Sequence, residues 1–187
     1  MTDSPILVIA LGNPGPKYEG TRHNIGVDAL EELLSRVTPM PAQLSVHRRT
    51  NTEIAELPAG RLGPRKVVLA RTREFMNLSG GPTKALANYF GVPARDIVVL
   101  HDELERDFGV VDLHLGGGDH GHNGLKSITK SLGTKDYHRV AMGIGRPPGR
   151  MDPAPFVLKP FSKAESAELP IVCADAADAV ERFLASQ

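Results

Sequence analysis

Side chains that can exchange protons or take part in hydrogen bonds follow several apolar runs of this 187-residue chain. An imidazole has a reference pKa of about 6.5 and can exchange a proton near neutral pH, while a carboxylate can orient it. Asparagine amides can donate hydrogen bonds to a developing negative charge. The residues of these kinds that stand after predicted strands or loops are Asn13, Tyr18, His23, Asn77, Asp102, His122 and Asn123.

Each of these residues, taken alone, also has a structural interpretation. A lone histidine such as His23 is more often structural than catalytic. Asn77 and Asn123 stand where they would cap helices, and Asp102 would serve equally well as a loop cap. In an open α/β sheet, however, ligands bind where the carboxyl ends of the strands meet. The joint placement of these residues after strands therefore favours a functional site.

Several catalytic templates do not fit the chain. Gly118–Ser127 lacks the Gly-Lys-Ser of a phosphate-binding loop, and Gly12–Gly15 is not a dinucleotide fingerprint. There is no Gly-x-Ser-x-Gly, and Cys173 lies in an apolar helical stripe, so covalent catalysis has no good candidate. Six possible metal ligands are close in sequence: His101, Asp102, His114, Asp119, His120 and His122. Because no helical His-x-x-x-His pair with a nearby glutamate exists, we expect no metal and no other cofactor.

Apolar runs and turn residues predict alternating strands and helices. Strands are expected at Pro5–Leu11, within Ser45–Leu57, and at Lys66–Ala70, Ile97–Leu100, Val110–Leu115 and Tyr137–Gly145. Helices are expected at Asn24–Val37, Asn77–Phe90 and Asn123–Leu132, and in a tail that opens with a Ser162/Glu165 capping box and has its longer second part from Pro170. The alternation predicts one α/β domain over residues 1–187, with a mixed, mostly parallel twisted sheet and helices on both faces.

The composition suits one folded domain, with 41% hydrophobic and 24% charged residues. The net charge is zero, but lysine and arginine outnumber the acids in residues 45–73 and 121–150. These basic blocks either form one positive face for a polyanion or are solvated surface. A single cysteine excludes an internal disulfide, and neither a membrane span nor a signal peptide is recognisable. We therefore expect a cytoplasmic protein without a membrane partner.

The polar residues stand in four longer motifs. These are Leu11-Gly12-Asn13-Pro14-Gly15 with Tyr18 and Thr21-Arg22-His23-Asn24-x-Gly26; Phe75-Met76-Asn77-x-Ser79-Gly80; His101-Asp102-Glu103-Leu104; and Gly116-Gly117-Gly118-x-x-Gly121-His122-Asn123-Gly124-Leu125-x-Ser127. Together they closely resemble the bacterial-type peptidyl-tRNA hydrolases, and Gly143-Ile144-Gly145-Arg146-Pro147 continues the match. The similarity runs from about Ile6 to Ser162.

This resemblance implies a monomeric, metal-free α/β hydrolase that cuts the ester between a peptide and the 3′ ribose of tRNA. An ester has a good leaving group, so water and a neutral base can suffice. His23 would be that base, Asp102 would orient it, and Asn13 would be a third catalytic residue that helps select N-blocked acyl groups. The residues expected to bind peptidyl-tRNA are Tyr18, Phe75, Asn77, His122 and Asn123.

The chain departs from the family at positions that are often basic there. Asp112 and His114 follow the His-Asp-Glu segment, Ala141 precedes the Gly-Ile-Gly strand end, and Thr72-Arg73-Glu74 replaces a usual Pro-x-Thr or Pro-x-Ser. Since the family's basic residues grip the tRNA 5′-phosphate, we hypothesise a weakened phosphate clamp. The cations left as possible phosphate contacts are Lys126, Lys130, Lys135, Arg139 and Arg146.

Two other functions stay open. The substituted basic positions leave room for a catalytically decayed RNA-binding protein on the same fold. The histidines and aspartates between His101 and His122 leave room for a metal-dependent hydrolase of another ester.

Overall fold

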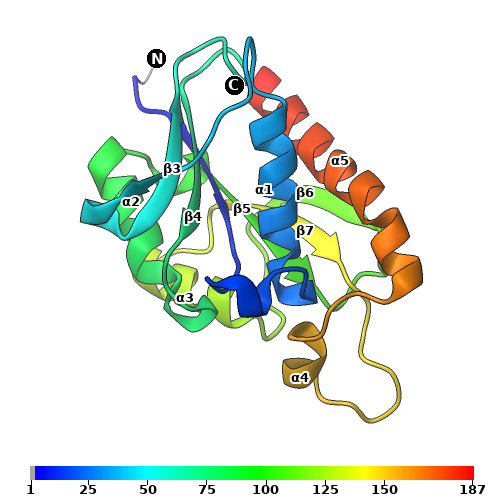
Figure 1. Cartoon of the computed structure of the whole chain (residues 1–187). Coiled ribbons are helices and arrows are strands. Elements are labelled where there is room, and N and C mark those ends of the chain that lie inside the picture. The colour runs from blue at the N-terminus through cyan, green and yellow to red at the C-terminus, as the bar shows by residue number, and fades with distance from the viewer. Residues whose placement is uncertain (1–2) are drawn as a thin grey trace.

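The four central strands of the sheet are the most apolar runs of the sequence, and they lie parallel to one another. In the computed structural model, which describes residues 3–187, a seven-stranded sheet has the order β2-β3-β4-β1-β5-β7-β6 (Figure 1). The central strands are β4 (Val67–Thr72), β1 (Ile6–Ala10), β5 (Ile97–Glu103) and β7 (His138–Gly143). All their mutual pairings are parallel, and β1 and β5 are buried throughout. Such burial is expected of parallel strands covered on both faces.

Antiparallel strands close both edges of the sheet. β3 (Thr52–Leu57) pairs with β4, β2 (Ser45–His47) pairs with β3, and β6 (Val111–Leu115) pairs with β7. The outermost strands β2 and β6 contain no fully buried residue, because one side of each lacks a neighbouring strand. The predicted α/β class with a mixed, mostly parallel sheet is confirmed.

Helices cover both faces of the sheet (Figure 1). The helices on these faces are α1 (Ile25–Ser35), α2 (Gly80–Phe90), α3 (Asn123–Leu132) and α5 (Lys163–Ala185), whereas the short α4 (Pro153–Val157) lies beyond the sheet. α1 and α5 share one hydrophobic core with Val8 and Leu100, whereas α2 and α3 share another with Ile9 and Val99. Successive residues of a strand point to opposite faces, so β1, β4 and β5 each contribute to both cores. Within residues 3–187, none of the helices has the length and apolarity needed to cross a bilayer.

Short 3-10 turns lie in the connections between the strands and helices. They are η1 (Pro16–Tyr18), η2 (Arg22–Asn24), η3 (Arg48–Thr50), η4 (Met76–Leu78) and η5 (Ala94–Asp96). The predicted helix at Asn77–Phe90 is therefore a 3-10 turn followed by α2, and α2 ends at Gly91 in a left-handed conformation, as expected of a helix C-cap.

Two boundaries differ from the predictions. β5 does not end at Leu100 but continues through Glu103, since its last three residues pair with β7. The predicted break at Pro170 was wrong: α5 is one helix from Lys163 to Ala185, with Pro170 inside it. Pro170 lies on the exposed side, and the buried stripe beyond it, which includes Val172 and Ala176, anchors the helix to the core. The Ser162/Glu165 capping box is confirmed.

A glycine lets α2 and α3 approach closely. A Cβ atom on Gly80 would lie 2.1 Å from the backbone oxygen of Ser127, whereas one on the neighbouring Gly81 would meet nothing within 4 Å. The Gly80 amide also donates a 2.8 Å hydrogen bond to Ser127 Oγ. The contact therefore fixes the spacing of the two helices that begin beside the candidate site.

We expect Gly80→Ala to lower the free energy of unfolding by at least about 1–3 kcal/mol, because the methyl group overpacks a backbone contact. Gly81→Ala, the matched control in the same helical turn, should leave it unchanged or raise it by up to about 1 kcal/mol. Urea denaturation of both variants measures the difference. Equal stability of the two variants would contradict the close approach.

Candidate active site

His23 and Asp102 meet across the carboxyl edge of the sheet. His23 lies in η2, between β1 and α1, and Asp102 is the penultimate residue of β5. His23 Nδ1 lies 2.8 Å from Asp102 Oδ2. The side chains are nearly enclosed, with residue exposures of 9% and 3%. Because Nδ1 donates to the carboxylate, Nε2 of His23 is the nitrogen left to accept a proton.

His122 holds the other oxygen of the same carboxylate. Its Nε2 lies 2.7 Å from Asp102 Oδ1, and its Nδ1 accepts hydrogen bonds from the backbone amides of Gly124 and Leu125. Since Nδ1 accepts, Nε2 carries the proton and donates a hydrogen bond to Asp102 Oδ1. His122 is thus the N-cap of α3 as well as a support of Asp102. The expected role of His122 in binding substrate stays a prediction.

The charges of the pair favour an ionised carboxylate beside a basic imidazole. Burial alone would raise the pKa of Asp102, but the nearby His122 and His23 outweigh it and hold the pKa far below its ordinary value. Burial lowers the pKa of His23, but the charge and the hydrogen bond of Asp102 together raise it by more. The net shift of the His23 pKa is therefore upward from 6.5. His23 is therefore a stronger base than a free imidazole.

Asn13 is held so that its amide NH₂ is available. Its Oδ1 accepts a 2.7 Å hydrogen bond from the backbone amide of Met76, which fixes the orientation of the amide group. Asn24 brackets its backbone, donating to Asn13 O and accepting from Asn13 N. Nδ2 of Asn13 has no protein partner among residues 3–187, so it can donate to a ligand. Sequence reasoning missed Asn24, although it stands in the same motif as His23.

The other predicted substrate-binding residues lie at or near the surface: Tyr18 in η1, Phe75 and Asn77 at η4, and Asn123 at the start of α3. Tyr18 and Phe75 make an edge-to-face contact with centroids 6.2 Å apart, and Phe75 is 52% exposed. Asn77 and Asn123 are exposed as well. Neither asparagine is a helix N-cap, since Ser79 and His122 have those positions for α2 and α3. The structural interpretation of Asn77 and Asn123 as caps was therefore wrong.

Two hollows meet at Asn123. The first, which we call the histidine cleft, has a volume of about 390 Å³. It is lined by His23, Asp102, His122 and Asn123, and from α4 and its N-cap by Asp152, Pro153, Ala154 and Val157. The second, the lysine groove, has a volume of about 740 Å³ and is lined by Asn77, Asn123, Lys126 and Lys130, among other residues of α2 and α3. The two hollows differ in charge, because the cleft contains Asp102, Glu103 and Asp152, whereas the groove contains two lysines and one carboxylate, Glu74.

His23, Asp102 and His122 are arranged as hydrogen-bond partners rather than as metal ligands. One atom each of His23, Asp102 and His122 lies within 4.8 Å of the others, a spacing that a metal ion would also tolerate. However, both ring nitrogens of His122 and both oxygens of Asp102 are engaged in hydrogen bonds. A zinc ion would need these atoms as free ligands.

The other candidate ligands lie apart from this chain of hydrogen bonds. His114 pairs with Asp112, and His120 pairs with Glu103 at 2.6 Å. Burial lowers the pKa of His101 to about 4, so this ring stays neutral. Through its contact with His120, Glu103 joins the glycine-rich loop to β5. Sequence reasoning did not single out Glu103.

Asp112, His114 and Ala141 lie together on β6 and β7, whereas Thr72-Arg73-Glu74 lies at the end of β4. Asp112 is in register with Ala141, and His114 contacts Asp112. Asp112 also forms a 2.9 Å ion pair with Arg106, so its charge is partly compensated. Ala141 is fully buried. The patch therefore presents no uncompensated cation.

The remaining predicted phosphate contacts do not form one surface. Arg139 is 1% exposed and donates to the backbone oxygens of Gly117 and Gly118, so its proposed phosphate contact was wrong. Arg139 instead binds the glycine-rich loop through these two backbone oxygens. Arg146 is exposed but pairs with Glu105. Lys126 and Lys130 lie side by side in the lysine groove.

The first basic block contributes less charge than its composition suggests. Arg65 pairs with Asp96, and Arg71 pairs with Glu53. The charges of these two arginines are therefore compensated, whereas Lys126 and Lys130 of the second basic block line the lysine groove.

Comparisons with known proteins identify similar sequences and structures. A family model described as peptidyl-tRNA hydrolase matches residues 7–187. The chain is 60% identical over 184 residues to "Peptidyl-tRNA hydrolase 1" of Corynebacterium glutamicum, covering 98% of each chain. It is 55% identical to "Peptidyl-tRNA hydrolase" of Rhodococcus erythropolis, covering 98% of this chain and 94% of the other. Its structure is similar to that of the peptidyl-tRNA hydrolase of Acinetobacter baumannii, with a TM-score of 0.87 and 27% identity over 100% of this chain and 90% of the other.

Replacing Asp102 by asparagine should lower the pKa of His23, because the variant keeps the burial and loses the charge that opposes it. A pH titration of the imidazole signals by NMR measures this pKa. His138, whose pKa is lowered chiefly by its own burial, is an internal control and should titrate as in the wild type. A His23 pKa that stays the same would show that the two side chains do not interact in solution.

Proposed function

The chain belongs to the peptidyl-tRNA hydrolase family, and on this basis we propose that it hydrolyses the ester bond between a peptide and the 3′ ribose of tRNA. The observation that carries the mechanism is the hydrogen bond between His23 Nδ1 and Asp102, which leaves Nε2 as a base at the histidine cleft. The family resemblance seen in the sequence motifs is confirmed by the match over residues 7–187.

In the proposed reaction, water attacks the ester carbonyl carbon and loses a proton to His23 Nε2. Asp102 stabilises the resulting imidazolium. The Asn13 amide donates a hydrogen bond to the developing oxyanion. The bond from carbon to the ribose 3′ oxygen then breaks, and this oxygen takes the proton back from His23. The products are the peptide carboxylic acid, which loses its proton to solvent, and tRNA with a free 3′ hydroxyl group, and His23 returns to its neutral form.

The two hollows suit the two parts of the substrate. The lysine groove presents Lys126 and Lys130, which favour the phosphates of an RNA strand. The exposed Phe75 ring beside Tyr18 offers a surface on which a base can stack. The histidine cleft includes the apolar Leu104 and Val157 and would take the acyl group. Asn123 stands where they meet, and this is where the ester would lie.

The alternatives fit the site less well. A decayed RNA-binding protein would have no need of the buried Asp102 carboxylate with a histidine on each oxygen. A metal-dependent hydrolase would need the same atoms as ligands. Both alternatives can be tested in the same assay.

His23→Ala should lower kcat for N-acetyl-aminoacyl-tRNA by about 10²- to 10⁴-fold, because it removes the general base. His138→Ala, the control, removes a histidine at the start of β7 that bonds to Arg95 O, and should retain wild-type turnover. A strong chelator should leave the wild-type rate unchanged. No turnover by the wild type would favour the RNA-binding alternative, and loss of turnover with the chelator would favour the metal alternative.

Removal of the 5′-phosphate from the tRNA should change kcat/KM by less than about tenfold, since each charged hydrogen bond to it would contribute about 1.5–3 kcal/mol and the Asp112 patch presents no uncompensated cation. Asp112→Lys should increase the discrimination and make the slope of log affinity against log salt more negative by about 0.9. Kinetics with phosphorylated and dephosphorylated substrates measure both effects. Strong discrimination by the wild type would disprove the weakened clamp.

A further inference from the structure

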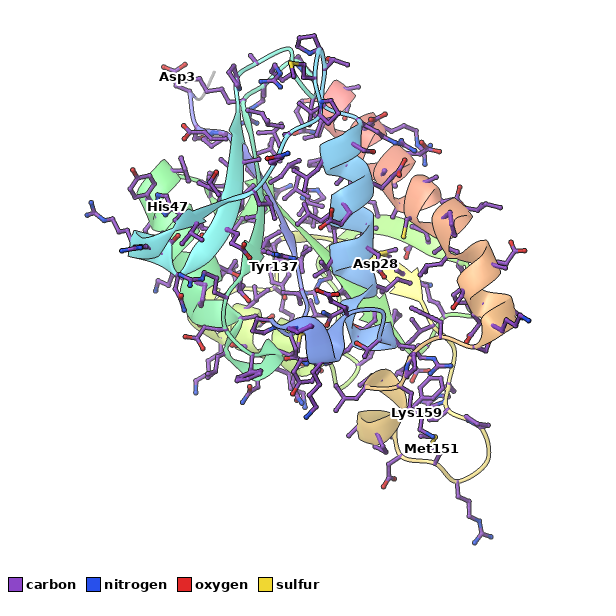
Figure 2. The ribbon with its side chains drawn as sticks, in the orientation of Figure 1. Asp3, Asp28, His47, Tyr137, Met151 and Lys159 are labelled. Carbon is purple, nitrogen blue, oxygen red and sulfur yellow. The ribbon has the colours of Figure 1, made fainter. Side chains whose placement is uncertain are left out.

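One wall of the histidine cleft comes from a segment that projects from the body of the fold. Figure 1 shows α4 and the loop before it extending beyond the sheet, and Figure 2 shows Met151 and Lys159 in this projecting part. Asp152, Pro153, Ala154 and Val157 of this segment line the cleft opposite the histidines. The width of the cleft therefore depends on what holds α4 in place.

The Arg22 side chain makes several contacts with this segment. Its Nη1 donates to the backbone oxygen of Pro160 at 3.0 Å and, more weakly, to that of Phe156 at 3.5 Å. Its guanidinium group lies over the Phe156 ring, 4.1 Å from the centroid. Its Nη2 pairs with Glu165 at the start of α5, at 3.0 Å. One buried side chain thus binds the C-terminal half of α4, the residues that follow it and the start of α5.

Arg22 also lies next to the proposed base. Arg22 and His23 are consecutive residues of η2, and the Arg22 backbone amide donates to Lys159 O. Glu165 is fixed in turn, because its Oε1 also accepts from the Ser162 amide in the capping box of α5. Movement of α4 relative to His23 would therefore have to break charged hydrogen bonds that are shielded from water.

We propose that Arg22, held by Glu165, is a positioning residue that sets the distance between α4 and His23 and thereby the fit of the acyl group in the histidine cleft. This inference rests on the proposed function. Arg22 does not face the reacting atoms, so its loss should weaken the binding of the acyl group more than the proton transfer. The effect should grow with the size of the acyl group, because larger groups contact more of α4.

Arg36 provides a matched control within the same protein. It pairs with Glu32 and Asp178 and donates to the backbone oxygen of Ala174, so it joins α1 to α5 much as Arg22 joins η2 to α4. Arg36 lines neither hollow. Arg36→Lys therefore weakens the packing of two helices without altering the cleft.

The test compares Arg22→Lys with Arg36→Lys on N-acetylglycyl-tRNA and on a tripeptidyl-tRNA. Lysine keeps the charge but cannot reach two carbonyl oxygens and a carboxylate at once. For Arg22→Lys we expect KM for the tripeptidyl substrate to rise by about tenfold or more, with a change below about threefold in kcat and in KM for the small substrate. Arg36→Lys should change neither parameter. Equal losses on both substrates, or the same losses in the control, would overturn the proposal.

Two further measurements separate positioning from general damage. Hydrogen exchange of the backbone amides of Ala154, 156–159 and Phe161 should become faster in Arg22→Lys and stay the same in Arg36→Lys. The NMR-measured pKa of His23 should stay at its wild-type value in both. Glu165→Gln keeps a capping side chain and weakens only the ion pair, so it should show a smaller rise in KM of the same kind. Unchanged exchange in Arg22→Lys would show that Arg22 does not hold α4. An inactive wild type would instead contradict the proposed function and leave this exchange result standing.

Discussion

The site depends on one buried carboxylate with a histidine on each oxygen. Removing an ionised carboxylate from water costs several kcal/mol unless hydrogen bonds replace its solvation. The two N–H groups of His23 and His122 supply those bonds to Asp102. Three segments must therefore remain together: η2, the end of β5 and the N-terminus of α3. The constraint that makes the fold tolerate a buried charge is the same one that prepares an imidazole to accept a proton.

From this centre, hydrogen bonds reach the remaining loops. His122 caps α3, so the position of Asp102 is joined to a helix terminus. Asn24 holds the Asn13 backbone, and Asn13 in turn accepts from the Met76 amide. Arg22, one residue before His23, reaches the segment that carries α4. The walls of both hollows are therefore connected to the short turn η2. The histidine cleft and the lysine groove meet at Asn123.

The interior and the rim of the site differ in how tightly their residues are constrained. A change at Asp102 or His122 would leave a buried polar group unpaired, at a cost of about 1–3 kcal/mol or more. Asp112 and His114 lie on the edge strand β6, and Asp112 forms an ion pair with Arg106. A charge on such a partly exposed strand can be exchanged for the opposite charge at little cost in stability. This contrast explains how the chain keeps the four motifs around Asp102 while it differs at Asp112 and His114.

The sequence by itself determined the α/β class, nearly all strands and helices, the capping box and the set of polar residues at the strand ends, because periodicity, caps and turn residues are local signals. It did not determine that β5 extends through Asp102, that Pro170 lies inside a helix or that Arg139 is buried, since pairing with β7 and packing of α5 override local preference. It also could not show that His122 shares Asp102 with His23, or that Arg22 holds α4. Those contacts join residues that are far apart in the chain, and only the order of the strands brings them within hydrogen-bond distance.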